Sequence, residues 1–238
     1  MKRTLICIGL VAAVSTALAI DPRLGSVSPP GVQAGTEVEL RFTGSRLDDA
    51  EEILFYKKGF QVVKIEEVKG NFVRAKVKVA ADCPLGEHPV RVRTKGGVTE
   101  LRTFYVGPFP VVARVKPKAG EPHQKLALNS TIAGSVPNES QEIFTVDAKK
   151  GQRLSAEIES MRLGRGFYDP YIEILDTKGF ILSRSDDTKL FIQDCYASAI
   201  VPLDGTYTIK VRETSYGSIG LYRMHVGTFA RPTAVYPG

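Results

Sequence analysis

The stretch that decides the fold is "GTYTIKVRE", residues 205–213. Its apolar residues Tyr207, Ile209 and Val211 alternate with threonine, lysine and arginine. A period of two places the apolar set on one face of a β-strand and the polar set on the other. We therefore expect a half-buried antiparallel strand, entered through a turn at residues 203–205.

The same alternation recurs over most of the chain. It is found in "TEVELRF" (36–42), "FVRAKVKVA" (72–80), "PVRVRT" (89–94) and "QRLSAEIES" (152–160). The runs are short and are separated by Gly, Pro, Asp or Asn, a pattern typical of sandwiches and barrels. The sequence predicts an all-β protein made of two consecutive antiparallel β-sandwich domains.

A proline-rich break divides the alternating runs. "GPFPVVARVKPKAGEP" (107–122) holds four prolines and no steady alternation, which favours a semi-extended linker. We expect a first domain over 21–107, a linker over 108–117, a second domain over 118–228 and a tail or further linker over 229–238.

The first nineteen residues are typical of a signal peptide. Lys2 and Arg3 precede an apolar run over 5–14, and the small residues Ala17 and Ala19 flank Leu18, as at a cleavage site. The apolar run is too short to span a bilayer comfortably. We expect an exported protein, periplasmic, on the cell surface or extracellular, with a retained N-terminal anchor as the alternative and no later membrane span.

Charge and cysteines exclude two further classes. The net charge of +6 falls to +4 when Lys2 and Arg3 leave with the leader, and the basic residues are interspersed with acids. Nucleic-acid binding requires a clustered basic surface, so we expect no nucleic-acid partner. Cys83 and Cys195 fall in different predicted domains. We expect two free buried thiols, since a disulfide requires the Cα atoms to lie within about 7 Å.

The first unit resembles an IPT/TIG domain, which has an immunoglobulin-like fold. The matching segments are "SVSPPGVQAGTEVELRFTGSRL" at its start and "CPLGEHPVRVRTKGGVTELRTFYVG" at its end. They share the family's Ser-Pro turn and its closing Pro-x-Gly turn with two strands. The resemblance implies an Ig-like sandwich.

The second unit resembles a bacterial pre-peptidase C-terminal domain. The matching segments are "EPHQKLALNSTIAGSV", "EIFTVDAKKGQRLSAEIE", "DPYIEILDTKGFILSRSDDT" and "PLDGTYTIKVRE", in the family's order. This resemblance implies a jelly-roll-like sandwich of the kind that accompanies secreted peptidases. The pair of units resembles exported multidomain proteins of planctomycete-type bacteria, in which further β-rich repeats follow.

Five acids fall in "YDPYIEILDTKGFILSRSDDT", residues 168–188. Turn chemistry accounts for Asp169 and Asp176, and Gly179 is expected at positive φ in a hairpin connection. Asp186 and Asp187 stay open. They are either solvated turn carboxylates or the start of a Ca²⁺ site, which requires about 6–8 oxygen ligands.

The second resemblance implies another calcium position. Collagen-binding relatives hold Ca²⁺ with acids of an entry segment and of a loop before the Phe strand. Here Glu121 matches the entry, while His123 and Gln124 replace two oxygen ligands, and Glu139 and Glu142 stand in the loop. We expect a degraded or lost site and no other cofactor.

The loop "MRLGRGFY" combines Arg162 and Arg165 with Phe167 and Tyr168. Loops on a rigid sandwich concentrate binding residues, and arginine with aromatic side chains is a mixture enriched at interfaces. One interpretation is a partner-binding loop. The alternative is a connection whose aromatic side chains cap the core.

We expect no enzyme. His88 and His225 lie in strand patterns, "YGSIG" has Tyr216 where a nucleophile elbow needs glycine, and no zinc-protease, P-loop or dinucleotide motif occurs. The function expected is therefore binding or scaffolding, with protein or extracellular polysaccharide as the partner implied by the resemblances. An accessory module of a secreted peptidase system and a calcium-dependent adhesion module are the alternatives.

Overall fold

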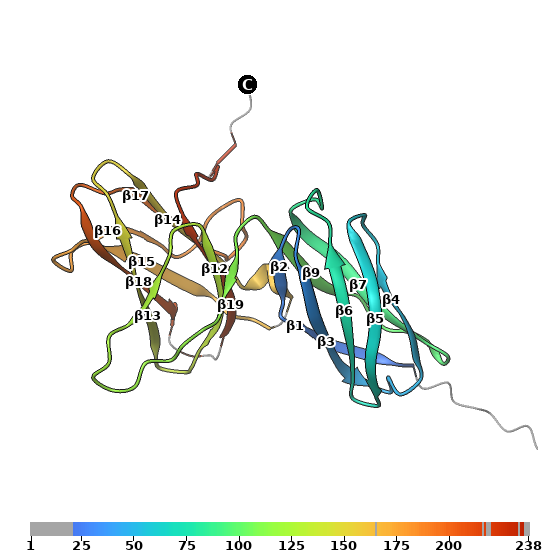
Figure 1. Ribbon diagram of the computed structural model, residues 1–238. Coiled ribbons are helices and arrows are strands. Elements are labelled where there is room, and N and C mark those ends of the chain that lie inside the picture. Colours follow the sequence, from blue (N-terminus) through green and yellow to red (C-terminus); the bar gives the residue numbers. More distant parts are fainter. Residues whose placement is uncertain (1–20, 165, 216, 218–219, 233, 236–238) are drawn as a thin grey trace, which may run out of the picture.

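Two β-sandwiches lie side by side in the computed structural model, joined by a short connection (Figure 1). The structure describes residues 21–164, 166–215, 217, 220–232 and 234–235. The predicted leader, residues 1–19, lies outside them. Strands make up nearly all of the regular structure, with one 3-10 helix, η1 (Met161–Leu163), among the described residues. The all-β prediction with two sandwiches is confirmed.

Two sheets of similar size face each other in the first sandwich. Four antiparallel strands form one sheet, in the order β1-β3-β6-β5, and the other has the order β2-β9-β7-β4 with β8 beside β7. The strands are β1 (Arg23–Ser28), β2 (Gly31–Gln33), β3 (Glu37–Ser45), β4 (Ala50–Phe55), β5 (Phe60–Lys69), β6 (Phe72–Val79), β7 (Gly86–Thr94), β8 (Gly97–Val98) and β9 (Arg102–Gly107).

The second sandwich has two five-stranded sheets. Their orders are β10-β12-β19-β14-β17, here called the inner sheet, and β11-β13-β18-β15-β16, the outer sheet. The strands are β10 (Val111–Val112), β11 (Gln124–Leu126), β12 (Ser130–Val136), β13 (Gln141–Ala148), β14 (Arg153–Glu159), β15 (Pro170–Leu175), β16 (Ile181–Ser185), β17 (Tyr196–Ile200), β18 (Gly205–Glu213) and β19 (Gly220–Gly227).

Each sandwich buries its own apolar set, as the alternation predicts. Tyr207, Ile209 and Val211 of β18 all lie in the core of the second sandwich, and the first sandwich has a separate core that includes Phe42 and Phe104. Both cysteines are free and buried, one in each core. The prediction of two free thiols is confirmed.

The linker is more ordered than its composition indicates. Val111 and Val112 form β10, which pairs in parallel with β12 at the edge of the inner sheet. Two other short parallel pairs, β2 with β9 and β11 with β13, extend otherwise antiparallel sheets. Strands of two or three residues are too short to show an alternation, so the sequence pattern could not reveal them.

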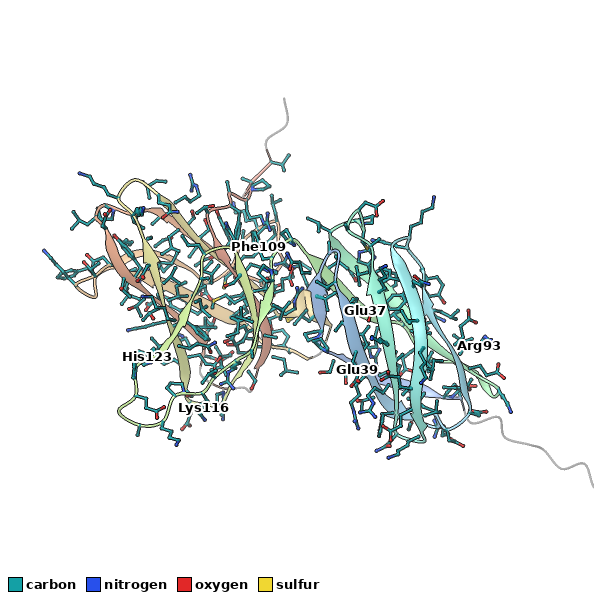
Figure 2. All side chains as sticks on the ribbon, viewed as in Figure 1. Glu37, Glu39, Arg93, Phe109, Lys116 and His123 are labelled. Carbon is teal, nitrogen blue, oxygen red and sulfur yellow. The ribbon has the colours of Figure 1, made fainter. Side chains whose placement is uncertain are left out.

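Outside the cores the charges are distributed in pairs. On the exposed face of β3 and β6, Lys76 lies 2.6 Å from Glu37 and Arg74 lies 3.8 Å from Glu39. Figure 2 shows both glutamates on the surface of the first sandwich, on the side that faces the second. Such interspersed charge agrees with the absence of a basic stripe from the sequence. Within the described residues, no helix has the length and apolar character that crossing a membrane requires.

Candidate binding surface at the domain junction

The carboxylate of Asp194 organises the loops beside the domain junction. Asp194 is fully buried. Its Oδ1 accepts hydrogen bonds from the backbone N–H of Ser160 (2.9 Å) and of Met161 (2.7 Å). The first N–H groups of a helical turn have no partner within the turn, so an acid placed there satisfies them and complements their partial positive charge. Asp194 thus fixes η1 where the chain leaves β14.

Arg162 connects the same carboxylate to a second one. Its Nε lies 2.5 Å from Asp194 Oδ2 and its Nη2 lies 3.0 Å from Glu157 Oε1, while the guanidinium stacks 4.7 Å from the ring centre of Phe191. Burial opposes the charge of Arg162. The hydrogen bond that Arg162 donates to Asp194, together with the charges of the nearby glutamates, outweighs burial and raises the pKa of Arg162, so the guanidinium stays protonated and holds the two loops together.

A second buried ion pair lies on the same face of the inner sheet. Arg223 Nη1 is 2.6 Å from Glu159 Oε2, and Glu159 Oε1 is 3.2 Å from His225 Nε2. The other ring nitrogen of His225 is 2.7 Å from the hydroxyl of Thr131. Burial would raise the pKa of Glu159, but the charges of Arg223 and His225 outweigh it and hold the pKa at about 2. Glu159 is ionised at neutral pH.

The first sandwich covers this face. Tyr105 of β9 donates a hydrogen bond from its hydroxyl to the carbonyl oxygen of Arg162 at 2.5 Å. Its ring lies under the guanidinium of Arg223, 5.6 Å from ring centre to carbon. A Cβ atom on Gly31 would approach within 2.7 Å of the same guanidinium. The two sandwiches therefore meet over the buried pairs, with η1 between them (Figure 1).

Exposed apolar side chains extend from the loops that this network fixes. Phe167 is 67% exposed, and Leu190 and Ile192, on either side of Phe191, are 42% and 70% exposed. Ile192 has a φ of +62°, a conformation that costs a branched residue free energy and that persists only where its surroundings hold it. We call Phe167, Leu190 and Ile192 the loop-tip residues.

The four residues predicted to bind a partner do not share one environment in the structure. Phe167 is exposed, as a binding role requires. Tyr168 is buried in the core of the second sandwich, so this aromatic side chain caps the core and the partner-binding interpretation is wrong for it. Arg162 is committed to Asp194 and Glu157, and its carbonyl contacts the first sandwich. Arg165 lies outside the described residues.

Two of the three glutamates of the expected degraded calcium position have other partners. Glu142 pairs with Arg114 and accepts a hydrogen bond from the hydroxyl of Tyr222. Glu121 Oε2 accepts from the backbone N–H of Lys118 at 2.9 Å, and Glu139 lies exposed in the β12–β13 turn. The structure groups no three His, Cys, Asp or Glu side chains of its described part in a way that could hold a metal ion. The degraded or lost calcium site stays a prediction.

Asp186 and Asp187 lie near Asp169 at the end of the outer sheet. Asp186 Oδ1 accepts from the hydroxyl of Thr214 at 2.7 Å. Burial, followed by the charges of Asp187 and Asp186, raises the pKa of Asp169 to about 6. The hairpin acid Asp176 accepts from the backbone N–H of two later residues, at 2.8 Å each, which confirms its turn role.

Sequence reasoning missed Asp194, Glu157 and Tyr105. Asp194 follows "FIQ" in a segment with no periodicity, and its partners lie more than thirty residues away. Glu157 stands at a polar position of the β14 alternation, where exposure is expected. The nearest signal is the adjacent aromatic pair Phe104 and Tyr105, since two aromatic side chains pointing to opposite faces indicate a strand buried on both.

The comparisons with known proteins give one family and several structures. Residues 21–104 match the family model described as quinohemoprotein amine dehydrogenase, alpha subunit domain III. That match spans less than half of the chain and names a different family from the IPT/TIG resemblance, which is not confirmed. Among curated proteins, none matches the chain.

Solved structures match at low sequence identity. The pre-peptidase C-terminal domain of a Bacillus anthracis collagenase is 15% identical over 46% of this chain and 99% of its own, with a TM-score of 0.35. Aeromonas hydrophila PliG, a periplasmic inhibitor of g-type lysozyme, is 15% identical over 44% of this chain and 95% of its own, with a TM-score of 0.34.

A third structure matches over both sandwiches. It is SGBP-B of the Bacteroides ovatus mixed-linkage glucan utilization locus, in complex with a mixed-linkage heptasaccharide. The identity is 10% over 85% of this chain, with a TM-score of 0.30, and the chain spans about half (52%) of that protein.

Proposed function

We propose that this chain is an exported, non-catalytic binding or scaffolding protein that presents loops of its β-sandwiches to a protein or an extracellular polysaccharide. The observation that carries the proposal is the anchoring of the loop tips by Asp194. Its buried carboxylate holds η1, and Arg162 joins η1 to the loop that carries Leu190 and Ile192. Apolar side chains exposed on a fixed scaffold lose little conformational entropy when a partner covers them.

The proposal that the protein is non-catalytic rests on the partners of its buried ionisable groups. Glu159 pairs with both Arg223 and His225 beneath the first sandwich, and Arg162 joins Asp194 to Glu157. Groups paired in this way stabilise the junction and are not directed at a reacting atom, which a general acid or base must reach within about 3 Å. Export is supported by the sequence pattern of residues 1–19, which is typical of a signal peptide.

The test compares two pairs of exposed apolar residues. The chain without its leader is immobilised, and cell-envelope fractions are passed over it after digestion with protease, after oxidation of polysaccharide with periodate, or untreated. The variant Phe167→Ser/Ile192→Ser alters the loop tips. The matched control Phe180→Ser/Ile181→Ser alters a hairpin whose side chains are similarly exposed, 68% and 48%.

We expect the loop-tip variant to retain at least tenfold less material than the wild type, because each interface anchor contributes roughly 1–2 kcal/mol. The control should bind as the wild type does. Loss after protease treatment would assign a protein partner, and loss after periodate a polysaccharide. Equal retention by the loop-tip variant and the wild type would contradict the proposal, as would the absence of retention by any form.

A further inference from the structure

The chain does not leave the second sandwich where β19 ends. Residues 228–231, here called the strap, contact Ser155 and Glu157 on the face of the inner sheet that points away from the core. Phe229 and Arg231 are half-buried, while Thr228 and Ala230 are exposed. This alternation shows an extended segment whose every second side chain points onto the sheet.

The sheet recognises the main chain of the strap. The carbonyl oxygen of Phe229 accepts hydrogen bonds from the hydroxyls of Ser155 (2.6 Å) and Tyr196 (3.2 Å). At the other end, the backbone N–H of Thr228 donates to Asn129 Oδ1 at 3.2 Å. These contacts fix the direction and register of an extended peptide, and they do not depend on its side chains.

Two side chains of the strap supply selectivity. The ring of Phe229 lies between Phe109 of the linker and Tyr196 of β17, with ring centres 5.6 and 6.2 Å away. Figure 2 shows Phe109 at the top of the second sandwich, on the side toward the first. Arg231 Nε then binds Glu157 Oε2 at 2.7 Å, so the sheet accepts an aromatic residue followed two positions later by arginine.

Glu157 makes the arginine position specific. Its side chain is only 3% exposed, and a buried carboxylate is stable only when its oxygens have charged or hydrogen-bonding partners. Arg162 occupies one oxygen from within the same sandwich, and the strap occupies the other. A guanidinium fits this position better than an ammonium, because its planar group also stacks 4.7 Å from the ring centre of Phe229.

The strap is held by few contacts, and they are of a kind that another segment could reproduce. The hydrogen bonds to Ser155 and Tyr196 reach a carbonyl group that every peptide has, and Arg231 keeps 35% of its side chain exposed. Segments with exposed alternate residues and few buried contacts open at low free-energy cost. From these contacts we infer that Ser155, Glu157, Tyr196 and Phe109 form a recognition site for an extended aromatic-x-Arg peptide, which the strap occupies until a partner segment replaces it.

The test releases the strap and offers the same sequence in trans. The variant Phe229→Ser/Arg231→Ser is made in the chain without its leader, and its fold is checked by circular dichroism. A fluorescent peptide with the sequence of residues 227–232, "GTFARP", is titrated into this variant and into the wild type. A second peptide carries citrulline in place of arginine, which keeps the size of the side chain and removes its charge.

We expect the released variant to bind the peptide at least tenfold more tightly than the wild type, and the citrulline peptide to bind at least tenfold more weakly than the parent. The milder variant Arg231→Gln should give an intermediate affinity. A folded released variant that binds no better than the wild type would overturn the inference. So would equal binding of the two peptides, or failure of both variants to fold, since the strap would then be part of the core.

Discussion

The hydroxyl of Tyr105 in the first sandwich donates its hydrogen bond to the carbonyl oxygen of Arg162 in the second, at 2.5 Å. Because the side chain of Arg162 is bound to Asp194 and Glu157, this single contact connects the first sandwich to the network that fixes the loop tips. The position of one domain and the order of the loops on the other are thereby coupled.

Removal of this hydrogen bond should weaken the junction. For Tyr105→Phe we expect a loss of about 1–3 kcal/mol in the free energy of unfolding, because the part-buried carbonyl of Arg162 loses its donor. Urea denaturation measures the loss. The control is Tyr56→Phe, since Tyr56 is exposed and its hydroxyl can bond to water. Equal stability of Tyr105→Phe and the wild type would contradict the role assigned to the contact.

The buried pair beneath Tyr105 should contribute more. For Glu159→Gln we expect a loss of about 3–5 kcal/mol, because Arg223 keeps its charge in a buried site with no counter-ion. Limited proteolysis should then cut the connection at 108–117 faster than in the wild type. The control is Glu52→Gln, which removes a surface partner of Arg93 at 2.9 Å. This change should be small, since water screens exposed pairs.

Acid should act through the same carboxylate. The pKa of Glu159 is lowered to about 2 in the folded chain, because Arg223 and His225 outweigh the effect of burial. Its contribution to stability is therefore complete above the unfolded pKa of about 4.5 and is lost as the pH falls toward 2. A melting-temperature series from pH 7 to pH 2 should decline less steeply in Glu159→Gln than in the wild type. Parallel curves would contradict this assignment.

Asp169 should make stability depend on pH with the sign opposite to that of Glu159. Burial, with the charges of Asp187, Asp186 and Glu213, raises its pKa to about 6, so the folded chain holds a proton that the unfolded chain has released. Its stabilising effect is complete below the unfolded pKa of about 4 and is lost as the pH rises through 6. Asp169→Asn should remove this decline and melt at a higher temperature than the wild type at pH 7.

A second variant separates charge repulsion from burial at Asp169. Asp187→Asn removes one neighbouring charge and should lower the pKa of Asp169, so that its decline in stability begins at a lower pH. Differential scanning calorimetry between pH 4 and pH 8 measures both variants. The melting temperature of the wild type should fall more between pH 4 and pH 7 than that of Asp169→Asn. Equal changes in the two proteins would show that the pKa of Asp169 is not raised.

Alternation predicted the strands and the residues that share a face, but it could not show whether the second face is covered. The alternation of β14 places Glu157 and Glu159 opposite the apolar residues, on the face that a half-buried strand exposes to water. Both are buried, because the strap covers Glu157 and the first sandwich covers Glu159. The hairpin at Asp176 and Gly179 was predictable because its contacts are local. The Tyr105–Arg162 contact was not, because it joins residues 57 positions apart.

Tyr168 is another residue whose burial depends on a position far away in the sequence. Its ring fits in the core because Gly220, at the start of β19, has no side chain: a Cβ there would lie 1.8 Å from the ring. For Gly220→Ala we expect a loss of about 1–3 kcal/mol in the free energy of unfolding, since an overpacked core must shift. Gly96→Ala is the control, because the nearest atom to its added Cβ is 3.7 Å away.

The double variant Gly220→Ala/Tyr168→Leu tests whether the clash with the ring is the cause. Leucine lacks the ring atoms that the new methyl group would meet, so the two losses should not add, and the double variant should be more stable than their sum predicts. Urea denaturation of the four proteins of this cycle gives the coupling free energy. Strict additivity would show that Gly220 is required by the backbone of β19 and that Tyr168 does not determine it.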